Sequence, residues 1–420
     1  MLRREGVSPS ERAPPFFCGA SRSAGRYFEQ SGHTMGKTYA ILGSGMQGTA
    51  AAYDLARFGD ADRILMGDIH LQQANRNSER ANRLVGRAVC EPHQVDALDE
   101  AELASFLEPV DVLLSCVPYW MHPRIAPVAI HTATSMVDMG GDTDVTMETL
   151  KLNEAARAAR VSVVPDTGLA PGLVNNLATH LMSKLDKVED VRLYSGGLPQ
   201  NPKPPFNYKL VFNIEGLVTE YVDEALAIRD CKLVRLKTLA DIEHIEWPGL
   251  GEMEAFVTSG GTSTAPYTFD GKVRTYEYKT IRFPGHCERM RIFLDFGFWG
   301  TEPIEVKGSM VKPRDLFQTL MADALRDDED KDQILVRAAV TGSKNGDDVR
   351  LQIDIHDKED TATGFSAMER MTGFSTSIYA IEIAAGNVEN GCIRYESAVP
   401  GTKVVEELKR RGVLITETNG

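Results

Sequence analysis

The segment Gly43-Ser44-Gly45-Met46-Gln47-Gly48 restricts the fold of this chain more than any other part of the sequence. It follows the apolar run 38–42 and precedes the helix-forming stretch 49–55. In a strand-to-helix turn of this kind, the first glycine permits a tight bend and the second lets a pyrophosphate approach the backbone. The third glycine lets helix and strand pack closely, and the N–H groups at the helix start face the negative charge. The segment therefore predicts a dinucleotide-binding turn, with a purely structural glycine-rich turn as the alternative.

An acidic residue after the next predicted strand indicates which dinucleotide is bound. The strand 63–67 ends at Asp68, about 20 residues after the third glycine. A carboxylate in this place accepts hydrogen bonds from the ribose hydroxyls of adenosine and repels a 2′-phosphate. The next residues, Ile69 and His70, offer no arginine that would hold such a phosphate. We therefore expect NAD as the cofactor rather than NADP.

Strand and helix patterns alternate from Met35 to about residue 165. The expected strands, separated by helical segments, cover 38–42, 63–67, 94–96, 110–117, 135–138 and 161–164. This order is typical of a doubly wound parallel sheet, whose ligands bind beyond the carboxyl ends of the strands. We therefore expect an α/β fold with an N-terminal Rossmann domain over residues 35–165.

A second domain is expected to follow. Aromatic and β-branched residues with partial period-two alternation indicate an α+β domain over 166–370, which would bind the substrate and supply a dimer contact. A helix and a strand within 371–420 are expected to return to the Rossmann domain. Residues 1–34, rich in Ser, Gly, Pro and Arg, are expected to be a disordered leader or a mis-started extension.

Composition argues against several classes of partner and site. The net charge is −14 and no basic tract occurs, which argues against nucleic acid or an anionic membrane as partner. No apolar run approaches the ~20 residues needed to span a bilayer. The six cysteines are scattered, without a C-x-x-C pair or clustered histidines, so we expect reduced thiols, a cytoplasmic location and no metal site.

Six motifs follow one another in the later part of the Rossmann domain and beyond it. They occupy residues 116–122, 137–141, 165–172, 195–199, 259–264 and 278–282. In this order they resemble the saccharopine dehydrogenase-like family, and within it the L-lysine 6-dehydrogenases, from residue 35 to about 298. The resemblance implies NAD-dependent oxidative deamination of the side-chain amine of L-lysine. The product would be 2-aminoadipate 6-semialdehyde, which cyclises to piperideine-6-carboxylate, together with NADH and ammonia.

Two other functions stay open at this point. One is a saccharopine or carboxynorspermidine dehydrogenase acting on a secondary amine, for which Arg274, Lys279 and Arg289 could supply a further subsite. Saccharopine reductases carry an acidic residue where this chain has Ala170, which weakens that alternative. The other is a protein that binds NAD without turnover. The expected partners are a lysine-like amino acid and a second copy of the chain in a homodimer.

Deamination requires a base that removes a proton from the ammonium group of the substrate. We expect this base to be His286 or His122, and the third expected catalytic residue, Asp166 at the end of the sixth strand, could orient a base or bind an ammonium group. A packing role is the alternative for each histidine, and a turn cap is the alternative for Asp166.

The expected substrate-binding residues are Tyr119, Asp142, Tyr208 and Arg282. The Arg282 guanidinium could clamp the α-carboxylate through two hydrogen bonds, or pair with a nearby glutamate, Glu277 or Glu288. Tyr119 could form a wall beside the nicotinamide, with Tyr208 in the same pocket. Asp142 could bind an ammonium or cap a helix.

Four residues outside the glycine turn and Asp68 are also expected at the cofactor. Asp96 follows the third predicted strand and would lie near the adenine. Cys116, Val117 and Pro118 follow the fourth strand and would line the nucleotide through backbone atoms, so the Cys116 thiol need not be reactive.

Overall fold

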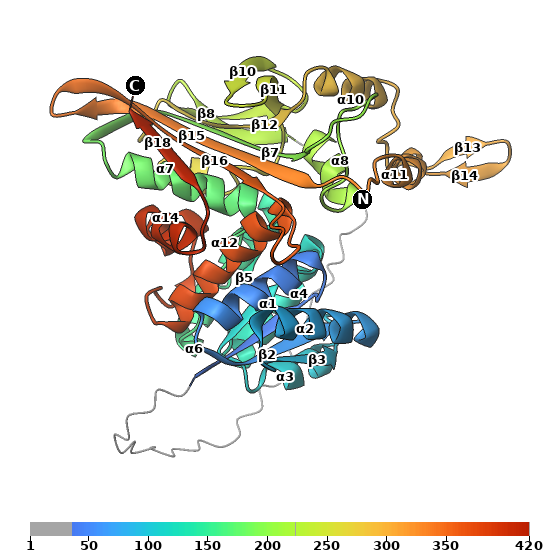
Figure 1. The fold of residues 1–420 in the computed structure, drawn as a ribbon, viewed down its shortest axis with the longest axis vertical. Helices are drawn as coiled ribbons and strands as arrows, with labels where there is room; N and C mark the ends of the chain where they lie inside the picture. The colour runs from blue at the N-terminus through green and yellow to red at the C-terminus, as the bar shows by residue number, and fades with distance from the viewer. Residues whose placement is uncertain (1–35, 223, 420) are drawn as a thin grey trace, which may run out of the picture. The chain divides into compact units, whose positions relative to one another are not determined.

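The structure is a computed structural model that describes residues 36–222 and 224–419. The expectations for residues 1–34 lie outside these ranges. Figure 1 shows the described part as two sheets with helices around them. Among the residues that are described, no helix has both the length and the apolar character needed to cross a membrane.

The first sheet has seven parallel strands in the order β17-β6-β5-β4-β1-β2-β3. These are β1 (Lys37–Leu42), β2 (Ala61–Asp68), β3 (Cys90–Gln94), β4 (Val112–Ser115), β5 (Ser135–Asp138), β6 (Ser162–Val164) and β17 (Gly391–Cys392). β1 lies between β2 and β4, and the strand order reverses there. Open α/β sheets bind their ligands at such a switch point. The predicted doubly wound sheet is confirmed, although its third strand covers 90–94 rather than 94–96.

Helices connect the strands of this sheet and the sheet to the rest of the chain. They are α1 (Met46–Phe58), α2 (Leu71–Val85), α3 (Glu100–Leu107), the short turn η1 (Tyr119–Met121), α4 (His122–His131), α5 (Thr143–Leu150), α6 (Asn153–Ala159), the turn η2 (Leu169–Leu173) and α7 (Val174–Met182). In α1 small alanines at 50–52 are fully buried, so the helix lies close to its neighbours. Apolar residues of β1, β2 and β4 lie in the core on both faces of the first sheet, as expected of central parallel strands.

The second sheet has nine strands and is mixed, as expected for an α+β domain. Its main order is β10-β11-β12-β7-β15-β16-β18, and β8 joins it beside β12 with β9 on its far side. The β12–β7 pair is parallel and the other pairs are antiparallel. The strands are β7 (Lys187–Pro199), β8 (Glu224–Arg229), β9 (Lys232–Lys237), β10 (Glu243–Trp247), β11 (Gly251–Val257), β12 (Thr275–Arg282), β15 (Asp332–Lys344), β16 (Asp347–Lys358) and β18 (Ile415–Asn419).

The remaining helices of the second half carry part of the cavity described below. They are α8 (Ile214–Val222), α9 (Ala265–Phe269), α10 (His286–Asp295), α11 (Pro313–Ala324), α12 (Ala367–Ala384), α13 (Tyr395–Ala398) and α14 (Gly401–Arg410). α12 contacts α1, β4 and β5 on one side and β15 and β16 on the other, so it joins the two sheets. In Figure 1 it lies, in red-orange, between the blue helices and the second sheet.

The C-terminal segment divides between the two sheets, which differs in part from the expectation for 371–420. α12 packs on α1, and the two-residue strand β17 extends the first sheet beside β6. The last strand, β18, instead pairs with β16 of the second sheet. The reason is the path of the chain, because α14 packs on α7, and α7 in turn packs against β7 and β15 of that sheet.

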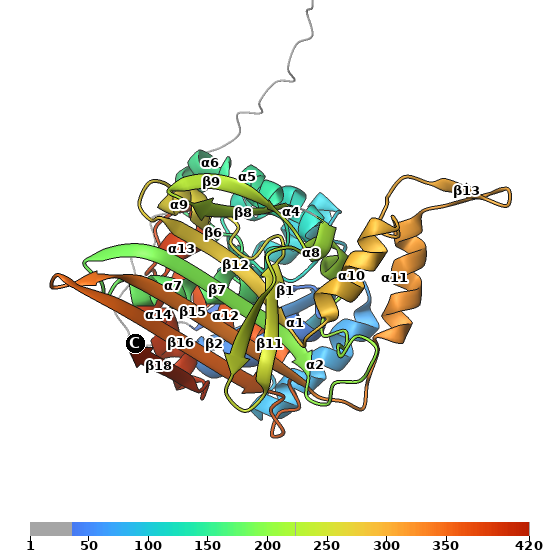
Figure 2. The ribbon, with the colours of Figure 1, turned by 90° about the horizontal axis from the view of Figure 1, so that it is seen from above.

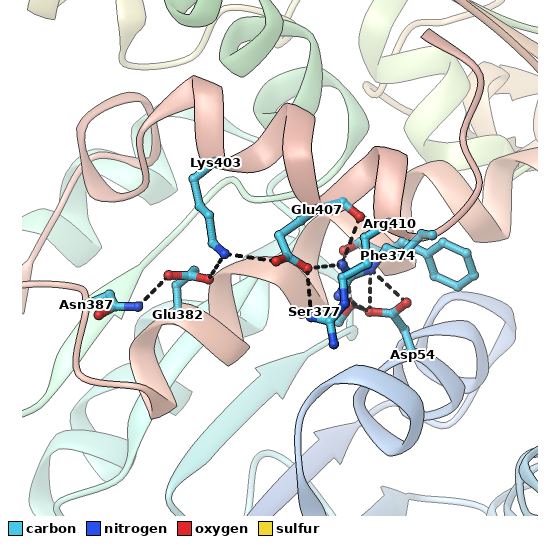
Figure 3. A network of polar contacts seen from close by, with 9 residues as sticks. Asp54, Phe374, Ser377, Glu382, Asn387, Lys403, Glu407 and Arg410 are labelled. Carbon is cyan, nitrogen blue, oxygen red and sulfur yellow. Dashed lines mark hydrogen bonds and ion pairs between the residues drawn. The ribbon is translucent and has the colours of Figure 1, made fainter.

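A buried ion pair fastens α14 to α1. Asp54 of α1 and Arg411, directly after α14, are 2.8 Å apart, and both side chains are fully buried. Figure 3 shows Ser377 of α12 and Glu407 of α14 near Asp54. Ser377 donates to Asp54, and Arg411 donates to Glu407. Three helices are therefore held together by charge as well as by apolar packing.

A hairpin between α10 and α11 extends away from both sheets (Figure 2). It consists of β13 (Ile304–Val306) and β14 (Ser309–Val311), which pair only with each other. We call residues 286–324 the arm. Exposed large apolar side chains gather on it: Ile292, Leu294, Phe296, Phe298, Ile304, Val306, Met310, Leu316 and Leu320.

Candidate active site

The glycine turn between β1 and α1 has the shape that a pyrophosphate requires. A Cβ on Gly48 would lie 2.2 Å from the carbonyl oxygen of Gly43, so no side chain fits between turn and helix. Beside Gly45, in contrast, the nearest heavy atom to such a Cβ would be Gln73 Nε2 at 4.0 Å. α1 has no side-chain cap on Gly45 and no acidic residue in its first turn. The open space at Gly45 and the uncapped N–H groups fit a dinucleotide phosphate.

Asp68 ends β2 beside this turn and also holds it in place. Its carboxylate accepts hydrogen bonds from the N–H of Ser44 at 3.0 Å, the N–H of His70 at 2.9 Å and the amide of Gln73 at 2.9 Å. An ionised carboxylate has about four acceptor sites, so these donors leave about one for a ribose hydroxyl. The sequence predicted only the cofactor contact, and the structure adds the support of the turn.

A cavity of about 640 Å³ lies between the carboxyl ends of the first sheet and the second sheet. The first sheet contributes residues 116–119 and 139–141, and Gln47 and residues 169–171 adjoin them. The second half contributes 195–197, 212–216, Thr219, Glu220, 259–260, Tyr278, Thr280 and Arg282. Thus all six motifs noted in the sequence reach this one cavity, although they are up to 160 residues or so apart along the chain.

Four residues after β4 line the cavity. Cys116, Val117, Pro118 and Tyr119 line the end of the cavity next to the glycine turn. A Cβ on Gly43 would come within 2.8 Å of the Cys116 carbonyl oxygen, which shows how close this segment is to the turn. Burial and the charge of Asp138 raise the pKa of the Cys116 thiol to about 12, so it is not a nucleophile near neutral pH. Their contact with a nucleotide stays a prediction.

Arg282 lines the opposite part of the cavity, at the end of β12. Its side chain is only 3% exposed, and its Nη2 lies 3.7 Å from Glu220 Oε2. It pairs with neither glutamate considered from the sequence, since Glu277 instead pairs with Arg192 and Arg229. A buried guanidinium that reaches a cavity can bind a carboxylate through two parallel hydrogen bonds.

Glu220 was not found by sequence reasoning. It lies on α8, where the side chain is 33% exposed and lines the cavity beside Arg282. Burial raises the pKa of this carboxyl to about 7, although the Arg282 charge opposes the shift. No motif singled out Glu220, because only the packing of α8 against the end of β12 brings the two charges together.

His286 does not lie at the cavity, which corrects its expected role as the base. It is fully buried, and its ring accepts or donates only to Tyr221 and to the Phe206 carbonyl in this structure. Burial, reinforced by the charge of Arg282, lowers the His286 pKa to about 3. A base needs to reach the substrate proton, and this imidazole is placed behind Arg282 instead.

His122 and Asp166 are buried and neither lines the cavity, so their expected roles stay predictions. His122 Nδ1 lies 3.6 Å from Asp138 Oδ2, and the other oxygen of Asp138 accepts from the N–H groups of Gly140 and Asp166. Asp166 accepts from Ser263 Oγ, and burial and the Asp138 charge raise its pKa to about 8. Asp138 holds the Gly140 turn through the N–H of Gly140, and this turn lines the cavity.

The other expected contacts have structural partners. Asp142 caps α5 by accepting from the N–H of Val145 at 3.0 Å, as in the alternative considered from the sequence. The Tyr208 ring lies under the guanidinium of Arg282, whose Cζ is 4.9 Å from the ring centre. Asp96 accepts from the N–H of Leu98 in the turn after β3. None of these three residues lines the cavity, whereas Tyr119 and Arg282 do.

No group of three or more His, Cys, Asp or Glu that could hold a metal ion occurs in the described ranges. The residues that fit a cofactor are those of the glycine turn, Asp68 and the segment 116–119.

Comparisons with known proteins agree with this geometry. The family model described as the saccharopine dehydrogenase NADP binding domain matches residues 39–164. The model described as the saccharopine dehydrogenase C-terminal domain matches residues 168–413. Mitochondrial alpha-aminoadipic semialdehyde synthase of Rattus norvegicus is 24% identical over 286 residues, which is 63% of this chain and 29% of that protein.

Two further relatives extend the comparison. The saccharopine dehydrogenase [NADP(+), L-glutamate-forming] of Saccharomyces cerevisiae is 23% identical over 327 residues, covering 72% of this chain and 71% of the yeast protein. The apo structure of a yeast enzyme of this name superposes with a TM-score of 0.73 at 18% identity, over 92% of this chain and 100% of that one. A homospermidine synthase from Legionella pneumophila in complex with NAD superposes with a TM-score of 0.62 at 12% identity, over 91% of each chain.

The chain thus spans about 29% of the length of the rat synthase it matches. Its own two halves match the two family models in order, and the second model alone covers more than half of the sequence. The chain belongs to the saccharopine dehydrogenase family.

Proposed function

We propose that this protein is an NAD-linked oxidoreductase that deaminates the side-chain amine of L-lysine. The products would be 2-aminoadipate 6-semialdehyde, which closes to piperideine-6-carboxylate, NADH and ammonia. The observation that carries the proposal is the set of charges that line the cavity.

Among the lining residues in the described part of the chain, Arg282 is the one cation, and Glu215 and Glu220 are the carboxylates. Lysine carries one carboxylate and two ammonium groups, so each charge of the substrate has an opposite charge in the cavity. Saccharopine carries three carboxylates, and two of them would face no cation there. Burying a charge without a partner is costly, so this inventory favours lysine over saccharopine.

The spacing of the two glutamates supports the same substrate. Glu215 and Glu220 are five residues apart on α8, which is roughly 7.5 Å along a helix axis. The two nitrogens of an extended lysine are separated by six bonds of about 1.5 Å in staggered conformation, or roughly 7 Å. Five residues also turn the chain by about 140° around the helix axis, but both glutamates line the cavity, so we propose that one binds each ammonium group.

These positions give each residue a role. Arg282 binds the α-carboxylate and Glu220 binds the α-ammonium, so the lysine side chain extends along α8 toward Glu215. Glu215 takes a proton from the ε-ammonium, which frees the nitrogen lone pair that the oxidation needs. A dinucleotide held by the glycine turn, Asp68 and residues 116–119 would supply the acceptor for the hydride of the adjacent carbon, and hydrolysis of the resulting imine would release ammonia. Tyr119 and the Gly140 turn line the cavity beside residues 116–118 and would lie against the nicotinamide.

The choice of NAD is part of this proposal. The family model and the yeast relative carry NADP in their names. In this chain, however, Asp68 places a carboxylate next to the adenosine ribose position, and that charge repels a 2′-phosphate. The remaining acceptor capacity of Asp68 supports NAD.

A panel of substrates tests the function. The purified full chain, with NAD or NADP, would receive lysine, saccharopine or carboxynorspermidine while NADH absorbance and free ammonia are recorded. We expect NADH and ammonia in equal amounts from lysine. NADH without ammonia from either of the other two would show a secondary-amine dehydrogenase and overturn the proposal. Binding of NAD without reduction by any of the three would show a protein without turnover.

Two analogues of lysine test the assignment of the charges. 1,5-Diaminopentane lacks the carboxylate, and 6-aminohexanoate lacks the α-ammonium. We expect both to have a much higher KM than lysine, the first because Arg282 loses its partner and the second because Glu220 does. A diamine that is oxidised as efficiently as lysine would contradict the role of Arg282.

We also propose a homodimer, for which the arm supplies support. Nine large apolar side chains are exposed on it, and concentrations of this kind mark contact surfaces. A two-stranded sheet alone is only marginally stable in water, so β13 and β14 gain from a second copy of the chain. The variant Phe296→Ser with Met310→Ser should sediment as a monomer, while Leu414→Ser, exposed outside the arm, should not change the assembly. A monomeric wild-type chain would refute the proposal.

A further inference from the structure

A chain of hydrogen bonds runs from Arg282 away from the cavity. Arg282 Nε donates to the Tyr221 hydroxyl oxygen at 3.3 Å, and that hydroxyl lies 3.0 Å from His286 Nε2. The other ring nitrogen, His286 Nδ1, lies 3.2 Å from the carbonyl oxygen of Phe206. Tyr221 and His286 are 1% and 0% exposed, and neither lines the cavity.

The Phe206 carbonyl fixes the direction of every bond in this chain. A carbonyl oxygen can only accept, so Nδ1 of His286 carries the proton and Nε2 is left as an acceptor. The Tyr221 hydroxyl must then donate to Nε2, and its lone pairs face the Nε–H of Arg282. Because burial and the Arg282 charge keep the His286 pKa near 3, the ring stays neutral and this direction does not reverse near neutral pH.

The same groups restrict the plane of the guanidinium. Tyr208 lies under its face, and Arg282 Nη1 donates to the carbonyl oxygen of Ile281 at 3.0 Å. With Nε held by Tyr221, both the position and the rotation of the fork are set before any ligand arrives. A preorganised fork loses less conformational entropy when it binds a carboxylate.

We propose that Tyr221 and His286 are positioning residues that hold the Arg282 guanidinium in the orientation needed to bind the substrate carboxylate. This inference rests on the proposed function, in which Arg282 is the carboxylate site. It gives His286, which the sequence suggested as a base, a different task two hydrogen bonds away from Arg282. In this arrangement Arg282 is held by Tyr221 in addition to its ion pair with Glu220.

Tyr221→Phe tests the proposal, because it keeps the ring that packs near Phe256 and Trp299 and removes only the hydroxyl. We expect the KM for lysine to rise roughly tenfold or more, as for loss of a hydrogen bond to a charged group, with a much smaller change in kcat. For 1,5-diaminopentane, which has no carboxylate, kcat/KM should change less than about twofold. In an Arg282→Gln background, Tyr221→Phe should have no further effect on lysine.

Two substitutions of His286 separate positioning from packing. In His286→Gln the amide oxygen can accept from Tyr221, so we expect the lysine KM to stay within a few-fold of the wild type. His286→Phe has no acceptor and should resemble Tyr221→Phe. Equal losses with lysine and the diamine, or equal effects of Gln and Phe, would mean that the residues serve only to maintain the fold and would overturn the proposal.

Calorimetric titration of lysine into the chain with bound NADH gives a readout that needs no turnover. Weaker lysine binding by Tyr221→Phe, with NADH affinity unchanged, supports the proposal even if no amine is oxidised and the proposed function fails. Lysine turnover with wild-type KM in Tyr221→Phe would overturn the inference and leave the function standing. No binding of lysine to the wild-type chain would overturn both.

Discussion

Replacement of Glu220 by glutamine tests the proposed substrate site most directly. Glu220 Oε2 lies 3.7 Å from Arg282 Nη2, and burial raises the pKa of its carboxyl to about 7. In the wild type the α-ammonium of lysine therefore meets a carboxylate at pH 8 and mostly a neutral acid at pH 6. We expect the lysine KM of the wild type to rise as the pH falls through 7, and that of Glu220→Gln to change little over the same range.

The size of the effect follows from the bond that is lost. A hydrogen bond to a charged group contributes about 1.5–3 kcal/mol, which corresponds to roughly 10- to 150-fold in KM at pH 8. At pH 6 the ratio between variant and wild type should fall toward one, since both then present a neutral group. With 6-aminohexanoate, which lacks the α-ammonium, the substitution should matter little at either pH.

The same substitution has a consequence for stability that can be measured without substrate. Because the folded-state pKa of about 7 lies above the ordinary value of 4.5, the folded protein binds more protons than the unfolded chain between these values. Stability from this group is therefore complete below pH 4.5 and is lost as the pH rises to about 7. With full desolvation, the stability lost between these pH values would be about 3 kcal/mol. Since the Glu220 side chain is 33% exposed to the cavity, we expect a loss of about 1–2 kcal/mol.

The difference in Tm between Glu220→Gln and the wild type should accordingly shift by about 1–2 °C in favour of the variant when the pH is raised from 5 to 8. Glu224→Gln, on β8 with a side chain 58% exposed, is the matched control and should show no such trend. Steady-state kinetics with both substrates and thermal melts at both pH values are the assays. The reasoning is refuted if the KM ratio is the same at pH 6 and pH 8, or if 6-aminohexanoate loses as much as lysine.

Three further predictions concern the cofactor site and the packing of the C-terminal helix. Gly45→Ala should weaken NADH binding at least about tenfold in a fluorescence titration, while Tm changes little because the added Cβ enters open space. Gly48→Ala should instead lower Tm. Equal effects of the two substitutions would contradict the assignment of the glycine turn. Asp68→Ala should raise kcat/KM with NADP relative to NAD, while Gln73→Ala, which leaves the charge in place, should not shift that ratio. Arg411→Met should lower the free energy of unfolding by about 3–5 kcal/mol in urea titrations, since it leaves a buried carboxylate unpaired, and a loss below about 1 kcal/mol would contradict this.

The nucleotide-binding half was predictable because its determinants are local. The glycine turn, the strand before it and the acidic residue after the next strand lie within residues 38–68, and their chemistry is written in residue types and spacing. The turn then fixes the parallel order around β1, since a helix that starts there must cross over to the next strand on one side. The second half lacks such a turn, and its pairing partners are distant, as for β7, which pairs with both β12 and β15.

The residues of the substrate site were harder to find because their roles depend on burial. Histidine is the side chain whose ordinary pKa best suits a base near neutral pH, so His286 and His122 were natural choices. His286 is buried by segments far away in the chain, Phe206 and Tyr221 among them. The same folding event leaves Glu220, one acidic residue among 60, facing the cavity. Residue type therefore identified groups capable of the chemistry, while the packing of α8 decided that Glu220 lines the cavity.

Asp68 shows why cofactor preference and turn stability are linked in this chain. Its three protein donors approach both oxygens, with Ser44 and Gln73 on one and His70 on the other. An asparagine here would turn one amide N–H₂ toward a backbone N–H whichever way it rotated, so a neutral replacement of the same shape leaves a buried donor without an acceptor. A substitution that admits a 2′-phosphate must therefore also replace the acceptors that hold Ser44 and His70. For this reason we expect Asp68→Ala to shift the preference from NAD toward NADP and, at the same time, to weaken the affinity for both dinucleotides.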